Sequence, residues 1–518
     1  MKTWQTAFER NRYYDSVFLM AVAHRLSDHE GIEEAVAVMG SPANKNILLD
    51  MGVEAASVAD ASPNDLIIAL CGDQEVVAGV LQDIEEWLVR PKTALATSTA
   101  VSLDEALSRQ STSNLAVISV PGEYAAAETE AALDRGMNVF LFSDHVSVED
   151  EVALKKKASE QGLIVMGPDC GTALIGGKGI GFANSVRRGT IGVVAASGTG
   201  LQEFTCLVHQ SGLGISHGLG TGGRDLSNSV GGLSTLAAID ALEEDPETKV
   251  IAIVSKPPGE ATLRVISERL SQCAKPVVAC FLGVSAGPDE QASFEVCGTI
   301  DDAVSAALRL AGSQGGEEEV HNHSQLELLA RDEAGRMAAG QKYIRGLFAG
   351  GTFCYQSQSV LRDAGVALHS NAPLEGVKLL GDTAASAGHS LVDMGADEFT
   401  VGTPHPMIDA TQRSRRITVE AEDPDVAVLL LDFILGFNSS KDPAGDLGDA
   451  ISSASRTAEA AGRHLSVVAS VCGTDEDPQG LENQMEVLRD VGAHVFASNV
   501  KASSFARDII LQRTKGGE

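Results

Sequence analysis

Two glycine–threonine turns, far apart in the chain, are the clearest sign of chemistry in the sequence. The first is residues 196–200 (ASGTG), directly after the apolar run 191–195, and the second is residues 349–352 (AGGT), directly after the run 344–348. Each pattern predicts a strand, a tight turn and a helix, so that backbone N–H groups and a helix N-terminus converge on one point, which favours an anion. We therefore predict that one phosphate-like group binds between the two turns. The alternative is a pair of ordinary glycine-assisted turns, because a lone glycine motif is weak evidence.

A lysine at the end of another apolar run adds a positive charge to the predicted anion site. Lys256 follows the run at residues 250–255 and precedes Pro257 and Pro258. Ligands of open α/β sheets bind beyond the carboxyl ends of the strands, and the two prolines stiffen the loop, so docking the side chain costs less entropy. We expect the Lys256 ammonium to contact the phosphate. The alternative is a surface lysine paired with Glu260.

Three further polar residues could take part in chemistry. His405, in the stiff segment 403–406 (TPHP), could donate to a substrate carbonyl or carboxylate, or order its own loop. Arg224 could clamp a substrate carboxylate, or pair with an adjacent acid such as Asp225. Asp432 follows an apolar run at a predicted strand end, where it could act in the site or cap a loop. Both interpretations stay open for each of these residues.

The sequence indicates no metal site and no bound cofactor. None of the eight cysteines forms a CxxC pair or has metal-type spacing, so buried reduced thiols and a cytoplasmic location are expected. His321 and His323 lie in an acidic stretch and are interpreted as surface residues rather than a metal pair. Asn44 and Lys45 open a predicted helix after Pro42, where a capping role is expected, and a binding role for Asn44 is the alternative.

Composition and charge narrow the classes of partner. The chain has 518 residues, of which 44% are hydrophobic, so it can bury the cores of several domains. Lys and Arg number 39 and Asp and Glu 71, which makes the formal net charge −32, so the phosphates of a nucleic acid would be repelled. No apolar run approaches the ~20 residues of a membrane-spanning helix, so no membrane partner is expected.

The elements that must position these residues alternate along the chain as strands and helices. Near the N-terminus the predicted strands are residues 17–20, 35–39 and 66–70, and the predicted helices are 43–51 and 74–88. Parallel α/β blocks are predicted at residues 114–185, 191–312 and 342–515, with a linker at 89–113 and a second linker, with a helical end, at 313–341. The last two blocks look like distant repeats, because each starts with a strand and a Gly–Thr turn and ends in an Ala-rich helix. We therefore expect two homologous sheets that face each other.

The middle of the chain resembles the α subunit of succinyl-CoA synthetase. Residues 165–171 (VMGPDCG) and then 192–199 (GVVAASGT) match the Gly-Pro-Asn-Cys segment and the Ser-Gly-Thr turn of that family, in the same order. This resemblance covers residues 114–312. The third block resembles the carboxy-terminal domain of the β subunit, in which an Asn-Gly-(Ala/Gly)-Gly turn supplies the opposing helix in the place of residues 349–352.

Motifs spread over almost the whole chain identify it as a member of the FdrA family. They are residues 39–45 (MGSPANK), 63–65 (PND), 121–125 (PGEYA), 167–172 (GPDCGT), 222–227 (GGRDLS), 254–258 (VSKPP) and 403–409 (TPHPMID). The implied fold is α/β and multi-domain, with two facing flavodoxin-like, succinyl-CoA-synthetase-like parallel-sheet domains, a partial Rossmann-like unit and a small N-terminal α+β domain. The implied bounds are 1–95 for the small, ferredoxin-like α+β domain, 110–188 for the CoA-binding-like partial Rossmann unit, 189–313 for the α-like ligase domain, 314–341 for a linker and 342–518 for the β-like ligase domain.

Three departures from the synthetase pattern bear on chemistry. The stretch that matches the phosphorylated Gly-His-Ala-Gly loop is residues 282–288 (LGVSAGP), and no histidine lies between His217 and His321. The first βαβ unit, with its Gly-rich nucleotide turn, has no counterpart. Lys256 stands where the synthetase has the Glu that orients its phosphohistidine, and a cation there suits direct contact with a phosphate oxygen. A histidine phosphorelay is therefore expected to be absent, and neither CoA nor ATP is an expected cofactor.

The FdrA resemblance implies a subunit of oxamate carbamoyltransferase. That activity interconverts oxalurate plus phosphate with oxamate plus carbamoyl phosphate, late in anaerobic allantoin use. The implied partners are these small molecules and two further carbamoyltransferase subunits, in a homo- or hetero-oligomer. The residues expected to act on the substrates are Lys256, His405 and Arg224, and those expected to hold the phosphate are Ser197, Gly198, Thr199, Gly350, Gly351 and Thr352. Such chemistry needs an anion site and polarising donors, but in principle no metal or redox centre.

Two other functions stay open at this point. One is an acyl-CoA ligase of the nucleoside-diphosphate-forming type, with its CoA and nucleotide sites on partner chains, and the missing histidine loop weighs against it. The other is a non-catalytic scaffold for partner enzymes. The two Gly–Thr turns and Lys256 weigh against the scaffold, which needs no anion site.

We predict that the chain is not phosphorylated on histidine, because the histidine loop is missing. Incubation with labelled ATP, or with acyl-CoA plus labelled phosphate, should leave no acid-labile, base-stable label on the protein. Stoichiometric labelling of that kind would overturn the prediction and favour the ligase.

Overall fold

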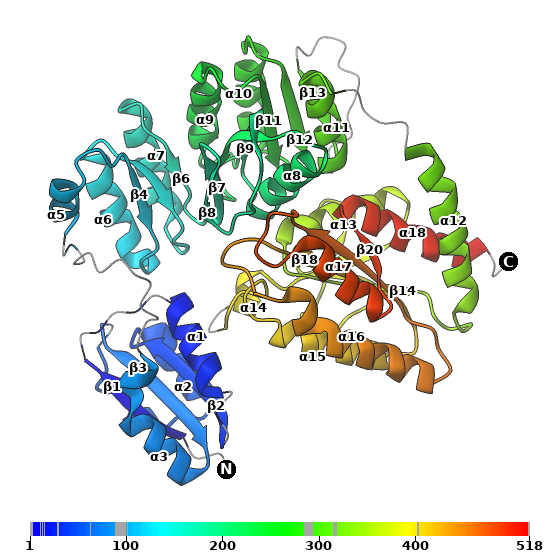
Figure 1. Ribbon diagram of the computed structural model, residues 1–518, viewed down its shortest axis with the longest axis horizontal. Coiled ribbons are helices and arrows are strands. Elements are labelled where there is room, and N and C mark those ends of the chain that lie inside the picture. The colour runs from blue at the N-terminus through cyan, green and yellow to red at the C-terminus, as the bar shows by residue number, and fades with distance from the viewer. Residues whose placement is uncertain are drawn as a thin grey trace. The chain divides into compact units, whose positions relative to one another are not determined.

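Two units make up the chain in this computed structural model: Met1–Ser111 with Gly402–Pro404, and Thr112–Val401 with His405–Glu518 (Figure 1). The structure describes residues 4–515, except 11, 13, 15, 28, 30, 63, 89–99, 101, 284–293, 314–318 and 401–402. Most of the stretch expected in place of the histidine loop, residues 284–288, therefore lies outside the described residues. Among the helices that are described, none is both long enough and apolar enough to cross a membrane.

The N-terminal unit is a three-stranded antiparallel sheet with helices. Its strands are β1 (Trp4–Glu9), β2 (Ile32–Met39) and β3 (Leu66–Gly72), in the order β1-β3-β2. The helical elements are α1 (Ser16–Ser27), α2 (Pro42–Asp50), η1 (Ala55–Ser57), α3 (Gln74–Gln82), α4 (Ile84–Trp87) and α5 (Leu103–Arg109). The central strand β3 is apolar on both faces, and its residues 66–71 are buried. The predicted strands at 35–39 and 66–70 are confirmed.

Three expectations for this unit are wrong. Residues 17–20, predicted as a strand, lie in helix α1, because the apolar pattern continues at helical spacing through the buried Leu19, Val22 and Leu26. The predicted helix 74–88 is two helices, α3 and α4, that meet at Asp83. The cap of α2 is Ser41, whose hydroxyl accepts from the Asn44 N–H at 3.3 Å, whereas the Asn44 and Lys45 side chains donate to carbonyl groups elsewhere.

The larger unit begins with a short parallel sheet. Its strands are β4 (Leu115–Ile118), β5 (Asn138–Leu141) and β6 (Val165–Met166), connected by α6 (Gly122–Leu133) and α7 (Val148–Glu160). This is the partial Rossmann-like arrangement that the alternating pattern predicts.

The second sheet of this unit has seven strands in the order β13-β12-β11-β9-β10-β7-β8. They are β7 (Thr172–Ile175), β8 (Lys178–Gly181), β9 (Arg188–Ala195), β10 (Ile215–Gly220), β11 (Val250–Ser255), β12 (Val277–Phe281) and β13 (Glu295–Cys297). The last five are parallel, and the β7–β8 hairpin is antiparallel at one edge. The helices are α8 (Gly198–Gln210), α9 (Leu233–Glu244), α10 (Glu260–Ser271) and α11 (Ile300–Leu310).

The third sheet has seven parallel strands in the order β16-β15-β17-β14-β18-β19-β20. They are β14 (Tyr343–Phe348), β15 (Leu368–Ser370), β16 (Lys378–Leu379), β17 (His389–Asp393), β18 (Val426–Ile434), β19 (Ser466–Cys472) and β20 (His494–Phe496). The helices are α12 (Glu319–Arg336), α13 (Gly351–Asp363), α14 (Asp397–Thr400), α15 (Thr411–Glu422), α16 (Pro443–Ala460), α17 (Leu481–Asp490) and α18 (Asn499–Lys515).

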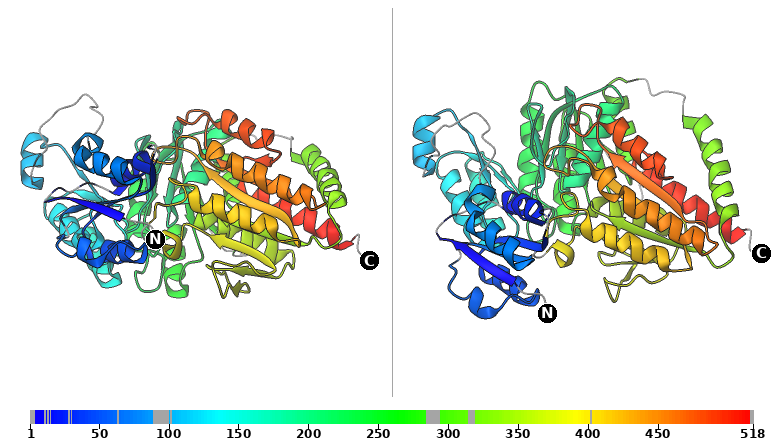
Figure 2. Two further views of the ribbon diagram at one scale, coloured as in Figure 1. Left: turned by 90° about the horizontal axis from the view of Figure 1, so that it is seen from below. Right: turned by 60° about the horizontal axis from the view of Figure 1, so that its bottom comes forward.

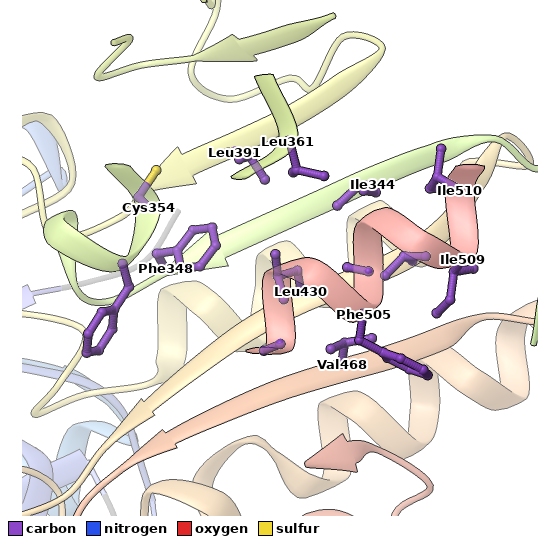
Figure 3. Close-up of a cluster of buried hydrophobic side chains, with 14 of the residues drawn as sticks. Ile344, Phe348, Cys354, Leu361, Leu391, Leu430, Val468, Phe505, Ile509 and Ile510 are labelled. Atoms are coloured by element: carbon purple, nitrogen blue, oxygen red, sulfur yellow. The ribbon is translucent and has the colours of Figure 1, made fainter. Parts of the chain in front are cut away.

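Helices cover both faces of the third sheet (Figure 2). On one face α15, α16 and α17 pack against strand residues such as Leu429 and Leu431. On the other face, α12, α13 and α18 pack against strand residues such as Leu430 and Val468. Figure 3 shows Phe505 of α18 beside these two residues. Each large apolar side chain buried there contributes about 1.5–3 kcal/mol. Helix α12 falls in the stretch expected to be a linker, and its Ala330 and Ala334 belong to this core.

The two large sheets share a strand order, as the suspected repeat requires. Strands β9, β11, β12 and β13 correspond to β14, β18, β19 and β20, and in both sheets the first strand of the series is central. Both first strands, β9 and β14, lead through a glycine turn into a helix, α8 or α13, and these two helices pack against each other. The sheets therefore face each other across their turns, and the α/β, multi-domain fold class is confirmed.

Candidate functional site

The structure brings the two glycine turns into direct contact. The hydroxyl groups of Ser197 and Thr352 are hydrogen-bonded to each other, although 155 residues separate them in sequence. A Cβ at Gly350 would stand 3.2 Å from the Cγ2 of Thr199. Ser197 is 9% exposed and Thr352 5%. The predicted juxtaposition of the turns is therefore present, and an anion between them has to replace or flank the hydroxyl contact.

A buried polar network behind the turns joins the two sheets. Glu203 on α8 accepts from the Asn499 N–H at 2.7 Å and from Nε2 of Gln356, on α13, at 3.2 Å. The Oδ1 atom of Asp301, on α11, accepts from the Ser498 hydroxyl at 2.7 Å. Burial, and next the charge of Asp301, raises the pKa of Glu203, which favours its protonated form. Because these hydrogen bonds cross between the two halves, shifting one turn past the other would leave their buried polar atoms unpaired.

In the first turn, two backbone N–H groups have no acceptor within the helix. The Ser197 hydroxyl caps α8 by accepting from the Gly200 N–H at 3.1 Å. The N–H groups of Gly198 and Thr199 lie in the first turn of the helix, where no helical acceptor is available, and neither bonds to another residue in the described part of the chain, so both can bind a ligand. Position 200 requires a glycine, because the Cβ of any other residue would stand 2.6 Å from the Ser197 Oγ.

In the second turn, a carboxylate already occupies the first two donors. Asp432 accepts from the N–H groups of Ala349 at 2.8 Å and Gly350 at 2.7 Å. Nη2 of Arg413 donates to the same carboxylate at 2.9 Å, so this buried charge is paired. The structure therefore supports the capping role of Asp432. Donors for a ligand at this turn begin at Gly351.

Lys256 lies where the second helix starts. It directly follows β11, and its Nζ is 5.6 Å from the ring centroid of Tyr355, in the second turn of α13. Its charge is close enough to lower the pKa of Asp393, at the end of β17. Glu260, the partner in the alternative interpretation, pairs with Arg264. Lys256 thus extends from one half of the site toward the other.

Asp393 is a residue of the site that sequence reasoning missed. Its Oδ1 accepts from the Gly395 N–H at 3.0 Å, and a Cβ at Gly351 would stand 2.5 Å from its Oδ2. Only 8% of the residue is exposed, and burial raises its pKa to about 6 although Lys256 lowers it. The available signal was an aspartate directly after the apolar residues 391–392, at a strand end, with a glycine two residues on.

His405 lies beside Asp393 as a neutral ring. Its Nδ1 accepts from the Met407 N–H at 3.2 Å, so the proton of the neutral ring is on Nε2. A Cβ at Gly395 would stand 2.7 Å from that Nε2 and 3.3 Å from the Oδ1 of Asp393. Burial, and next the charge of Arg413, lowers the His405 pKa to about 4. The ring can therefore act as an uncharged donor. The backbone carbonyl of His405 also accepts from the N–H groups of Ile408 and Asp409, which orders the loop.

Arg224 makes its polar contacts away from the turns. Its Nη2 donates to the Val146 carbonyl at 2.8 Å and pairs with Glu151 at 3.0 Å. The expected ion-pair partner, Asp225, is instead bound by Lys155 at 2.8 Å. The Arg224 side chain is 45% exposed, and a role as carboxylate clamp stays a prediction.

Two family models match parts of the chain. One, described as CoA-ligase, matches residues 347–509, and the other, described as AllF, heavy metal-associated domain, matches residues 1–106. The residues do not fit a heavy metal: the one cysteine of residues 1–106, Cys71, is buried at the end of β3. Among the described residues no group of three or more His, Cys, Asp or Glu side chains could hold an ion.

The first parallel sheet has a glycine, Gly122, in the turn after β4. A Cβ at this position would stand 2.3 Å from the Asp144 carbonyl oxygen. The close approach at this glycine is therefore to the chain's own backbone.

The chain is similar to solved structures at low identity. It is 17% identical to a Ca. Korarchaeum cryptofilum dinucleotide forming acetyl-coenzyme A synthetase, over 78% of this chain and 83% of that one, with a TM-score of 0.27. It is 14% identical to an ATP citrate lyase from Methanothrix soehngenii in complex with citrate and coenzyme A, over 80% of this chain and 85% of that one, with a TM-score of 0.33. TM-scores this low support no conclusion about the site.

Sequence relatives are more informative. The α subunit of a succinate–CoA ligase [ADP-forming] from Methanothermobacter thermautotrophicus is 30% identical over 34% of this chain and 60% of that subunit. The Escherichia coli protein YahF, which is uncharacterized, is 42% identical over 505 residues, 96% of this chain and 97% of YahF. With that identity over 96% of its length and the ligase model matching its third sheet, the chain belongs to the FdrA family of succinyl-CoA-synthetase-like proteins.

Proposed function

We propose that the chain is the phosphate-holding subunit of a carbamoyltransferase. The reaction is the interconversion of oxalurate plus phosphate with oxamate plus carbamoyl phosphate, carried out with two further subunits. The observation that carries the proposal is the contact of Ser197 with Thr352 at the N-termini of two facing helices, next to Lys256. Family membership and the match of residues 1–106 to a model named for AllF support the link to allantoin use.

The charges at the two turns suit a phosphate dianion. Each helix N-terminus acts as about half a positive charge, and Lys256 adds one, so the site offers about +2 in total. The Ser197 and Thr352 hydroxyls can rotate from each other onto phosphate oxygens. The N–H groups of Gly198, Thr199 and Gly351 supply further donors in fixed positions.

The proposed chemistry is one displacement at a carbonyl carbon. A phosphate oxygen attacks the ureido carbon of oxalurate, the C–N bond to oxamate breaks, and carbamoyl phosphate forms. Holding the phosphate in place supplies much of the catalysis, and a donor to the carbonyl oxygen supplies more. His405, neutral and protonated on Nε2, is the proposed donor, and Arg224 remains the proposed clamp for the carboxylate of oxamate.

The decisive assay is phosphate-dependent cleavage of oxalurate by the purified chain, alone and together with its partner subunits. Carbamoyl phosphate should form only when phosphate is present. An acyl phosphate or acyl-CoA formed at the expense of a nucleoside triphosphate would instead indicate a ligase, and binding of partner subunits without any turnover would indicate a scaffold.

We expect Lys256→Ala to weaken the use of phosphate or carbamoyl phosphate by roughly ten- to a hundredfold or more. A charge-assisted contact contributes about 1.5–3 kcal/mol, and every 1.4 kcal/mol is about tenfold. The fold should survive, because the side chain stands at a loop and supports little core. The measurement is kcat/KM for phosphate, together with the dissociation constant of inorganic phosphate.

Lys249→Ala is the matched control, because Lys249 precedes the same strand at its other end and its side-chain ammonium bonds only to the Pro246 carbonyl among the described residues. It should leave both constants near their wild-type values. Near-wild-type kinetics for a folded Lys256→Ala protein would decide for a surface role of Lys256.

We expect Gly351→Val to abolish phosphate binding. Its Cβ would meet the Oδ2 of Asp393 at 2.5 Å and stand where the anion approaches the turn. Calorimetric titration with inorganic phosphate measures the effect. Gly335→Val in helix α12 is the control, because a Cβ there meets nothing within 4 Å. Undiminished phosphate affinity in a folded Gly351→Val protein would exclude an anion at this turn.

A further inference from the structure

One acidic side chain at the site, Asp393, would repel an anion in its ionised form. Asp393 ends strand β17, and its Oδ2 lies against Gly351, the first free donor of the second turn. Its other oxygen accepts from the Gly395 N–H, and Oδ2 has no hydrogen-bond partner among the described residues. A carboxyl group that is 92% buried, because only 8% of the residue is exposed, and that faces the helix N-terminus with one open oxygen is in position to contact whatever the turn binds.

An ionised Asp393 conflicts with a phosphate dianion. With Lys256 and two helix N-termini the site offers about +2, and a carboxylate next to Gly351 lowers that to about +1. A protonated carboxyl group restores the balance and turns the open oxygen into a donor. Asp432 does not have this effect, because Arg413 neutralises it.

Charged or titratable groups face Asp393 from several elements. They include Lys256 after β11, Cys354 on α13, Glu398 in α14, Asp432 on β18 and the His405 ring ahead of α15. Lys256 favours the ionised form of Asp393, whereas burial and the two acids favour the neutral form. Proton uptake by Asp393 is therefore available near neutral pH, while His405 stays neutral above about pH 4.

We propose that Asp393 binds a proton together with the anion and delivers it to the nitrogen that leaves the carbamoyl carbon. The transfer step rests on the proposed function, whereas the coupling of proton and anion does not. As phosphate attacks oxalurate and the C–N bond breaks, the oxamate nitrogen takes the proton from the Asp393 carboxyl group. The proton of the hydrogen phosphate then replaces it, so no further acid or base is consumed. In the reverse direction Asp393 accepts a proton from the attacking amide.

Sulfate tests the coupling without the reaction, because it remains a dianion between pH 5 and pH 8. If the anion requires protonated Asp393, sulfate affinity is highest below the Asp393 pKa of about 6 and falls by up to about tenfold per pH unit above it. In Asp393→Asn the amide oxygen can still accept from Gly395, and sulfate affinity should no longer depend on pH. In Glu398→Gln, which removes a charge that raises the Asp393 pKa but can keep the bond from Asn371, the fall should begin at lower pH.

The transfer step is tested by turnover. Asp393→Asn should lower kcat for oxalurate phosphorolysis by about a hundredfold or more, the usual contribution of a general acid, and should remove the alkaline fall of the pH profile. A merely structural role would not move that profile. Wild-type kcat in Asp393→Asn overturns the proton transfer.

The two proposals fail in different ways. Wild-type sulfate affinity that is the same at pH 5 and pH 8 overturns the role of Asp393, whatever the reaction. Sulfate binding that depends on pH through Asp393, in a protein complex that does not cleave oxalurate, supports the coupling of proton and anion and overturns the carbamoyltransferase.

Discussion

The hydrogen bond between Ser197 and Thr352 depends on the buried network behind it. Glu203, Gln356 and the N-terminus of α18 satisfy one another between the two sheets, so the helices that carry the turns are held in one relative position. Breaking this network would leave several buried polar atoms without partners, at a cost of about 1–3 kcal/mol each. The position of every donor at the site follows from this constraint, because the turns belong to different halves of the chain.

The second turn differs from the first because a carboxylate occupies part of it. Asp432, neutralised by Arg413, takes the first two N–H groups and leaves those from Gly351 onward, so the two turns are not equivalent. Asp393 then lies against Gly351 with one open oxygen. The two aspartates differ in what pairs them, since one has an arginine in contact and the other is only near Lys256. Asp432 therefore has a structural role, whereas Asp393, as we propose, has a chemical one.

Membership in a ligase-like family does not settle the chemistry, because one fold can host several reactions. This chain has a pair of strand–turn–helix units that face each other, and such an arrangement suits a phosphate-like anion in any reaction that uses one. In sequence, residues 282–288 hold no histidine, and Lys256 directly follows β11. The anion site that we propose, with fixed backbone donors, Lys256 and an acid beside it, suits direct transfer of a carbonyl group to phosphate.

The sequence by itself determined the local features: the glycine turns, the strands that precede them, the repeated order of elements and the place of Lys256 at a strand end. These follow from backbone freedom at glycine and from hydrophobic periodicity, which act over a few residues. Short apolar runs are ambiguous: residues 17–20 alone predict a strand, and the helical spacing of Leu19, Val22 and Leu26 is visible only over a longer window. Tertiary structure alone decided which groups meet: that Asp432 fills the second turn, that Asp393 adjoins Gly351, and that Arg224 pairs with Glu151 rather than Asp225. Each of these contacts joins residues far apart in the chain, and their selection depends on packing between whole sheets, which no local pattern encodes.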